Sequence, residues 1–353
     1  MITTTPLLQL SKNSLFLTVI LFSLAIASSA YANKADERYL NAIQQLKENG
    51  YAGIDTAITD FNDITADYPD YWKAHLGLAN GYLLKYEFSE HKKNEWLEQS
   101  LLHLNVLIKN RQLLLEAYFR RALVQLNLHN IAEAKTDLQQ ALEIKPAYLE
   151  AHLIFLQLLL TNNEAAAARE KAAEWISNYP AASPAAQRFG DLFFSAEDYE
   201  TAAHYYEKGT QHRPEDSVLL MSLGRSYQKL GQDDKASDLF KKVLLLEPDN
   251  HEARFLNGVS LSNMDMVQEA VEQFELYRKD LPKEISALNN LAVLYEKIGN
   301  PLKAKLMWLK VKELSSDPKH KQRAESNLLR LLQSPGTDRK KESGPKNDPE
   351  VSQ

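Results

Sequence analysis

Prolines and alanines return at a fixed interval along most of this chain. The prolines stand 34 positions apart, at Pro146, Pro180, Pro214, Pro248 and Pro282. The alanines keep the same interval, at Ala134, Ala168, Ala202, Ala236, Ala270 and Ala304. A fixed period of this length indicates an array of stacked supersecondary units, in which each unit packs only on its neighbours.

One period, residues 217–250, shows the structure that each unit is expected to form. Its first half carries apolar or small residues three or four positions apart, on one helical face: Leu220, Leu223, Gly224 and Tyr227. Gly224 is small where the two helices of the unit are expected to approach closely. Its second half carries a further face, made of Ala236, Phe240 and Val243. Gly231 between them is suited to ending a helix in the left-handed conformation, and Pro248 cannot continue the second helix. The unit is therefore predicted to be two antiparallel helices joined by a short turn.

This set of positions resembles the tetratricopeptide repeat, a family with a Trp/Leu, Leu, Gly and Tyr face followed by Ala, Phe, Ala and Pro. Six consecutive units between residues 115 and 318 keep the register, beginning at Leu115, Leu149, Ser183, Ser217, His251 and Ile285. The resemblance implies an all-α fold, a right-handed α-solenoid of about eight helix-turn-helix repeats. We expect a capping helix over residues 319–333, with Ala324, Leu328 and Leu331 on its apolar side.

The regions on either side of the regular units are predicted separately. Residues 36–114 are interpreted as two irregular repeats of the same kind, with an insertion near residues 87–93. Residues 334–353 are rich in Pro, Gly and charged residues with a single aliphatic side chain, Val351, and are predicted to be a disordered tail.

The first 32 residues have the layout of a secretory signal peptide. Lys12 precedes an apolar run from residue 15 to residue 27, and Ala30 and Ala32 form an Ala-x-Ala cleavage site. The run is shorter than the roughly 20 residues of a spanning helix. We therefore expect cleavage after Ala32 and a periplasmic or secreted protein of a bacterial cell, with no membrane span after cleavage. The alternative is an uncleaved segment that tethers the chain to the inner membrane.

Charge and motif content exclude several functions. The net charge is −6, and −7 once Lys12 is removed with the leader, whereas a general nucleic-acid binder needs a basic surface. The sequence has no G-x-S-x-G elbow, no Gly-Lys phosphate loop and no dinucleotide fingerprint. Its nine histidines are scattered, and the chain has no cysteine. We therefore expect no enzyme activity, no cofactor, no metal site and no nucleic-acid partner.

The expected binding surface follows from the resemblance. In this family the first helix of each repeat lines the inner, concave face, which implies a groove for a protein partner. The candidate groove residues are Phe119, Arg120, Leu123, Leu153, Gln157, Gln187, Arg188, Asp191, Met221, Arg225, Phe255, Val259, Asn289, Asn290 and Val293. Their mixture of apolar, amide and charged side chains suits an extended peptide or a helix.

Two functions stay open at this point. The first is a non-catalytic protein–protein interaction scaffold, or adaptor, that is exported to the bacterial cell envelope. The second is an accessory or ligand-binding subunit of an envelope enzyme complex, in a polysaccharide, metal or haem pathway.

Overall fold

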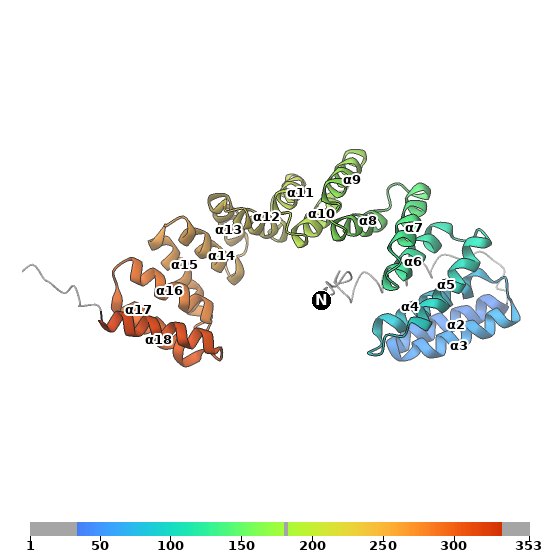
Figure 1. The fold of residues 1–353 in the computed structure, drawn as a ribbon, viewed down its shortest axis with the longest axis horizontal. Helices are drawn as coiled ribbons and strands as arrows, with labels where there is room; N and C mark the ends of the chain where they lie inside the picture. The colour runs from blue at the N-terminus through green and yellow to red at the C-terminus, as the bar shows by residue number, and fades with distance from the viewer. Residues whose placement is uncertain (1–33, 180–182, 334–353) are drawn as a thin grey trace, which may run out of the picture. The chain divides into compact units, whose positions relative to one another are not determined.

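The computed structural model describes residues 34–179 and 183–333, and within these ranges all regular structure is helical (Figure 1). Consecutive helices run antiparallel as pairs, as the 34-residue period predicted, so the all-α fold is confirmed. The expected signal peptide, residues 1–32, and the expected tail, residues 334–353, lie outside the described residues. The described residues form two compact units, one up to Leu192 and one from Phe193 onward.

The first unit consists of helix pairs that begin at Lys34. Its elements are α2 (Lys34–Asn49), the 3-10 helix η1 (Gly50–Gly53), α3 (Ile54–Asp67), α4 (Trp72–Phe88), α5 (Asn94–Lys109), α6 (Leu114–Asn127), α7 (Ile131–Ile144), α8 (Leu149–Thr161) and α9 (Ala165–Asn178). Helix α10 (Ser183–Ser195) contains the border between the two units.

The second unit continues the succession of pairs to the last described helix. Its remaining elements are α11 (Tyr199–His212), α12 (Ser217–Lys229), α13 (Asp233–Leu246), α14 (His251–Asn263), α15 (Val267–Asp280), α16 (Ile285–Lys297), α17 (Pro301–Leu314) and α18 (Pro318–Gln333). Ala324 of α18 is fully buried, and Leu328 and Leu331 pack against the core formed by α14 to α17.

The same backbone turn ends the first helix of every regular pair. Six residues spaced 34 apart adopt left-handed φ angles between 60° and 72°: His129, Asn163, Glu197, Gly231, Asp265 and Gly299. After each of them the next backbone N–H donates to a carbonyl five residues earlier, as in the Gln232 N to Tyr227 O bond of 2.8 Å. This is the Schellman arrangement, which satisfies the last carbonyls of a helix.

Small residues let the two helices of a pair approach closely in the second unit. A methyl group added to Gly224 would lie 2.6 Å from the Phe240 ring, and one added to Gly258 would lie 3.0 Å from the Phe274 ring. Both rings are fully buried, and each such burial contributes about 1.5–3 kcal/mol relative to exposure. The glycines are therefore sites of helix contact, as expected for Gly224.

Helix α4 is buried on all its sides. Leu78 and Leu84 pack with α2 and α3, whereas Leu76 and Leu83 pack with α5 and α6. A helix that is apolar all round belongs inside a structure. This helix therefore joins the two hydrophobic clusters of the irregular region.

Candidate functional site

The candidate groove residues lie on the first helix of each regular pair. Helices α6, α8 and α10 carry those of the first unit, and α12, α14 and α16 carry those of the second. They occupy the fifth, sixth and ninth positions of the 34-residue period, so they recur at one angle around successive helices.

Five of these side chains are buried within the chain. They are Phe119 and Leu123, each 6% exposed, Arg120 and Leu153, each 4% exposed, and Met221, 7% exposed. Such side chains offer a partner little surface, and their main contribution is to packing between helices.

The other ten keep accessible surface. Eight are half-buried: Gln157, Gln187, Arg188, Arg225, Phe255, Val259, Asn289 and Asn290. Asp191 and Val293 are exposed. Amide and arginine side chains in this state can hydrogen-bond a peptide backbone or carboxylate, and Phe255 and Val259 add apolar contact area.

Two of the candidate arginines are ion-paired with the neighbouring first helix. Arg188 of α10 donates to Glu150 of α8 at 3.1 Å, and Arg225 of α12 donates to Glu252 of α14. Glu150 and Glu252 were not among the predicted site residues. Both stand at the second position of their period, so an acidic residue at this position was the sequence signal for them.

Aromatic contacts position the two candidate phenylalanines, on α6 and α14. The Phe119 and Tyr148 ring centroids are 4.9 Å apart, and the Phe255 ring meets Phe274 and Tyr277, each at 5.4 Å. Burial, with a smaller effect of Glu150, raises the pKa of Tyr148 to about 12, so its hydroxyl is neutral near pH 7.

A repeated tyrosine–glutamate contact holds first helices against the preceding second helix. The Tyr295 hydroxyl donates to Glu275 Oε1 at 2.7 Å. The equivalent pair two periods earlier makes the same contact, in which the Tyr227 hydroxyl donates to Glu207. Burial, and then the bond to Glu207, raises the pKa of Tyr227 to about 12. A neutral phenol remains the donor at physiological pH, so these contacts position the helices that carry the candidate residues.

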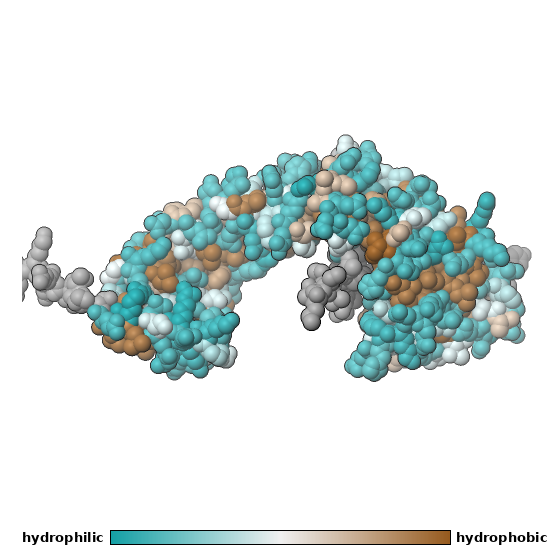
Figure 2. All heavy atoms as spheres, viewed as in Figure 1, coloured by the Kyte–Doolittle hydropathy of each residue, from teal (hydrophilic) through white to brown (hydrophobic). Residues whose placement is uncertain are grey.

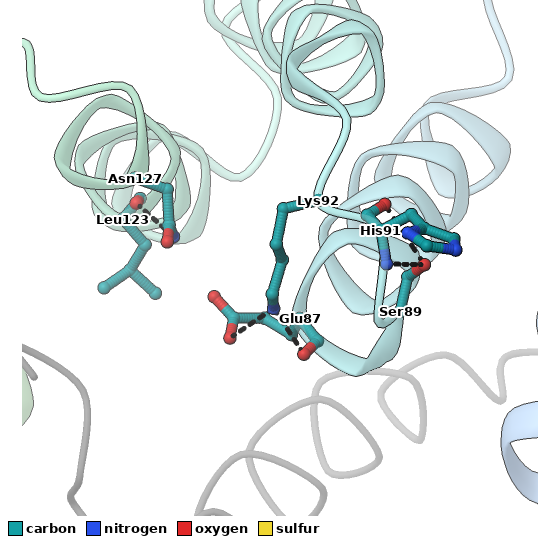
Figure 3. Close-up of polar contacts among 6 residues, drawn as sticks. All are labelled: Glu87, Ser89, His91, Lys92, Leu123 and Asn127. Carbon is teal, nitrogen blue, oxygen red and sulfur yellow. Dashed lines mark hydrogen bonds and ion pairs between the residues drawn. The ribbon is translucent and has the colours of Figure 1, made fainter.

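The connection between α4 and α5 is ordered by its own polar contacts (Figure 3). The Lys92 ammonium donates to the Glu87 carbonyl at 2.6 Å, and the His91 N–H donates to Ser89 Oγ at 3.2 Å. On α6, the Asn127 side chain donates to the Leu123 carbonyl at 3.1 Å. The insertion predicted near residues 87–93 thus has polar contacts within its own segment.

Metal binding and membrane crossing were searched for across the described ranges. No three His, Asp or Glu side chains in residues 34–179 and 183–333 gather closely enough to hold a metal ion. Within the same ranges, no helix combines the length and the apolar character that crossing a bilayer requires.

Two family models match parts of the chain, both described as tetratricopeptide repeat. One covers residues 115–148, the range of the first regular unit predicted from the sequence, and the other covers residues 193–257. A peroxisomal targeting signal receptor from Candida albicans is 31% identical over 83 residues, which are 24% of this chain and 14% of the receptor. The match therefore spans about a seventh of that relative's length.

Two solved structures of proteins with such repeats are similar to this chain. The C-terminal part of a TPR repeat-containing protein from Cytophaga hutchinsonii is 18% identical, with 69% of this chain and 97% of that chain covered and a TM-score of 0.53. YrrB, described as a TPR protein with an unusual peptide-binding site, is 26% identical, with 54% of this chain and 97% of that chain covered and a TM-score of 0.44. The 34-residue period, the paired helices and both family models agree, and the chain contains tetratricopeptide repeats, matched over residues 115–148 and 193–257.

Proposed function

We propose that this protein is a non-catalytic scaffold of the bacterial cell envelope that binds a peptide or a helix of a partner protein. The tetratricopeptide fold supports a protein–protein interaction scaffold in general. The observation that carries the finer proposal is the recurrence of accessible amide, arginine and apolar side chains at the fifth and ninth positions of successive first helices. Each unit offers such a surface by itself.

The partner is expected to meet these surfaces through its backbone and a few anchoring side chains. Asn289 and Asn290 of α16 supply amide groups, while Phe255 and Val259 of α14 supply apolar area. An extended peptide or an amphipathic helix uses both kinds of contact. The ion pair of Arg225 with Glu252 is exposed enough to exchange for a partner carboxylate at little cost.

Export rests on the sequence of the first 32 residues. Cleavage after Ala32 would leave Asn33 as the N-terminus of a periplasmic or secreted protein. Mass spectrometry of the protein purified from cells tests this, because detection of intact Met1 on the whole population contradicts cleavage and supports the membrane-tethered alternative.

Site-specific photo-crosslinking tests the binding surface. A photoreactive residue placed at Val293, which is exposed on α16, is expected to crosslink one defined protein in cells that express the chain. The matched control is the same residue at Glu272, which is exposed on second helix α15. Crosslinking at Glu272 and none at Val293 would contradict binding by the first helices.

A pair of substitutions sharpens this test. Changing Phe255 to Ala together with Arg225 to Gln is expected to abolish the Val293 crosslink, whereas Glu252→Gln, which breaks the same ion pair, leaves it in place. Capture of a polysaccharide or haem with no protein crosslink would instead favour the accessory, ligand-binding subunit.

A further inference from the structure

Helix α17 has a second apolar face that points away from the core. Ala304, Met307, Trp308 and Val311 are buried, each 3% exposed or less. On the opposite side, Leu302 is 79% exposed, Leu306 is 50% exposed and Leu309 is 53% exposed. Figure 2 shows hydrophobic surface at the end of the second unit formed by α17 and α18.

The other regular pairs provide an internal comparison for this face. At the positions equivalent to Leu306, the five preceding second helices carry Thr136, Glu170, His204, Asp238 and Glu272. The positions equivalent to Leu302 and Leu309 carry no leucine in any of those helices either. The outer leucines of α17 therefore do not belong to the repeat pattern.

The spacing of the outer residues is that of a coiled-coil seam. Leu302, Leu306, Leu309 and Glu313 follow one another at intervals of four, three and four residues. At about 100° per residue the three leucines fall within about 60° of the helix circumference. A stripe this narrow is typical of a helix–helix seam, whereas core-facing and bilayer-facing helices have apolar faces of about 100° or more.

Lysines flank the seam on both sides. In heptad terms, Lys303 and Lys310 occupy the e positions, and Lys305 and Lys312 occupy the g positions. Lys312 is paired with Glu325 of α18 at 3.1 Å, and both side chains of that pair are 50% exposed. Neither Lys305 nor Lys310 has an ion-pair partner among the described residues. Residues at e and g select the partner helix by charge, so this face calls for acidic residues opposite.

The charge of the surrounding segment agrees with this selection. Residues 301–333 contain eight Lys or Arg and three Asp or Glu, a net charge of +5 in a chain whose net charge is −6. A second copy of α17 would set lysines against lysines, which is unfavourable. A bilayer would have to accept Glu313 within the apolar stripe, which is costly.

We propose that the outer face of α17 binds an acidic amphipathic helix of a partner protein, with Leu or Ile in its seam and Glu or Asp at its flanking positions. This face lies on a second helix, so it is separate from the first-helix surfaces of the proposed function. The protein would then hold two partners, or two parts of one partner, at the same time.

Two synthetic peptides of about three heptads test the proposal. Both carry Leu and Ile in the seam and a fluorescent label; one has Glu at every flanking position and the other has Lys. Fluorescence anisotropy with the full chain is expected to show at least about tenfold tighter binding of the Glu peptide, with an affinity that falls as salt is raised. Equal binding of the two peptides, or no binding of the Glu peptide, overturns the proposal.

Substitutions on the outer face provide the matched controls. Leu306→Gln with Leu309→Gln is expected to weaken Glu-peptide binding at least about tenfold, while Asp238→Gln with Glu272→Gln, at the equivalent outer positions, changes it less than about twofold. Lys305→Glu with Lys310→Glu is expected to reverse the preference toward the Lys peptide. Because these side chains are on the surface, thermal melting of each variant should match the parent protein and show that it is folded.

Two further measurements separate the alternatives. The first is sedimentation of the protein with vesicles of phosphatidylglycerol and phosphatidylcholine. If the protein sediments with them only when Leu306 is intact, and does not bind the Glu peptide, the face binds a membrane and the proposal is overturned. Self-association that is lost with Leu306→Gln and Leu309→Gln would overturn it in favour of a second copy. Binding of the Glu peptide that is unchanged by Val293→Gln supports a site distinct from the first-helix surfaces.

Discussion

Two helix crossings in this protein are built from different chemistry. The α12/α13 crossing of the second unit is apolar, because Gly224 admits the buried Phe240 ring. The α4/α5 crossing of the first unit adds polar contacts to its leucine packing, because the buried Ser100 hydroxyl donates to the Ala79 carbonyl at 2.7 Å; it is the polar crossing of the two. A small residue at the contact point is common to both, but only the second crossing depends on hydrogen bonds.

A buried histidine pair completes the polar crossing. His75 of α4 and His103 of α5 approach with their Nδ1 atoms 2.9 Å apart, and His75 Nε2 is 2.7 Å from the Pro69 carbonyl. A carbonyl only accepts, so neutral His75 carries its proton on Nε2 and accepts through Nδ1. His103 therefore donates from Nδ1, and its ring lies parallel to the Tyr82 ring, 6.2 Å away.

The two glycines of α4, Gly77 and Gly81, contact a different neighbour, the preceding helix α3. A methyl group on Gly77 would lie 2.8 Å from the Phe61 ring of α3, the helix before α4. In the second unit the equivalent contact is made within the pair. In a paired-helix repeat, the aromatic ring that packs on the glycine can therefore come from the same pair or from the preceding helix. The pair stays together as long as other contacts join its two helices.

The largest effect is expected when the apolar crossing is overfilled. Gly224→Leu forces a side chain into the space of the Phe240 ring, and neither helix can move without disturbing its neighbours. We expect the free energy of unfolding to fall by about 3 kcal/mol or more, and the amides of α12 and α13 to lose protection from hydrogen exchange. Val218→Leu, at a position 62% exposed on the same helix, is the control and should change the melting temperature little. Unchanged melting of Gly224→Leu would show that this crossing is not a structural contact.

Acid is expected to weaken the polar crossing and spare the apolar one. Burial, and then the neighbouring His75, lowers the pKa of His103 from 6.5 to about 4. The unfolded chain binds this proton more readily than the folded chain. The contribution of neutral, buried His103 to stability is therefore complete above about pH 6.5 and is lost as the pH falls through about 4. The loss lowers the free energy of unfolding by up to about 3 kcal/mol.

Hydrogen exchange of α4 and α5 amides at pH 7 and pH 5, corrected for intrinsic rates, measures this loss. His103→Gln should remove most of the pH dependence between these values. Equal acid sensitivity in α12 and α13 would mean that the histidine pair is not its cause.

A change confined to the turn is expected to have a smaller effect. Gly231 between α12 and α13 has φ of +72°, and an added Cβ would meet no atom within 4 Å. Gly231→Ala therefore costs only the left-handed backbone conformation, about 1–2 kcal/mol. Denaturant unfolding measures the cost, with Asp265→Ala at the equivalent turn as the control, since a non-glycine residue there already bears most of that cost. If Gly231→Ala lowered the free energy of unfolding as much as Gly224→Leu, the turn would contribute as much to the stability of the pair as the helix contact does.

The smallest effect is expected from removing one hydrogen bond at the polar crossing. Ser100→Ala removes the hydrogen bond to the Ala79 carbonyl but leaves no buried donor without a partner. We therefore expect the free energy of unfolding to fall by about 1 kcal/mol or less. Ser100→Val, which adds volume without the hydroxyl, should cost more than alanine. If alanine stabilised the protein, the hydroxyl would not be needed at this crossing.

The sequence was a good guide where one physical constraint repeats. Gly224 and Gly231 were predicted as a close helix approach and a helix end, and the structure places them in these roles. It was a poorer guide to the binding surface, because a residue's angle on its own helix does not say what the next helix covers. Phe119 and Met221 were placed in the groove by register, yet neighbouring side chains bury both.

The sequence by itself determined the paired-helix repeat and the length of each unit, because helix faces, turns and helix ends are local and recur every 34 residues. The tertiary structure alone decided which polar groups meet, as in His75 with His103 and Arg225 with Glu252. The reason is distance along the chain: these partners are 28 and 27 residues apart, and only the stacking of helices brings them into contact.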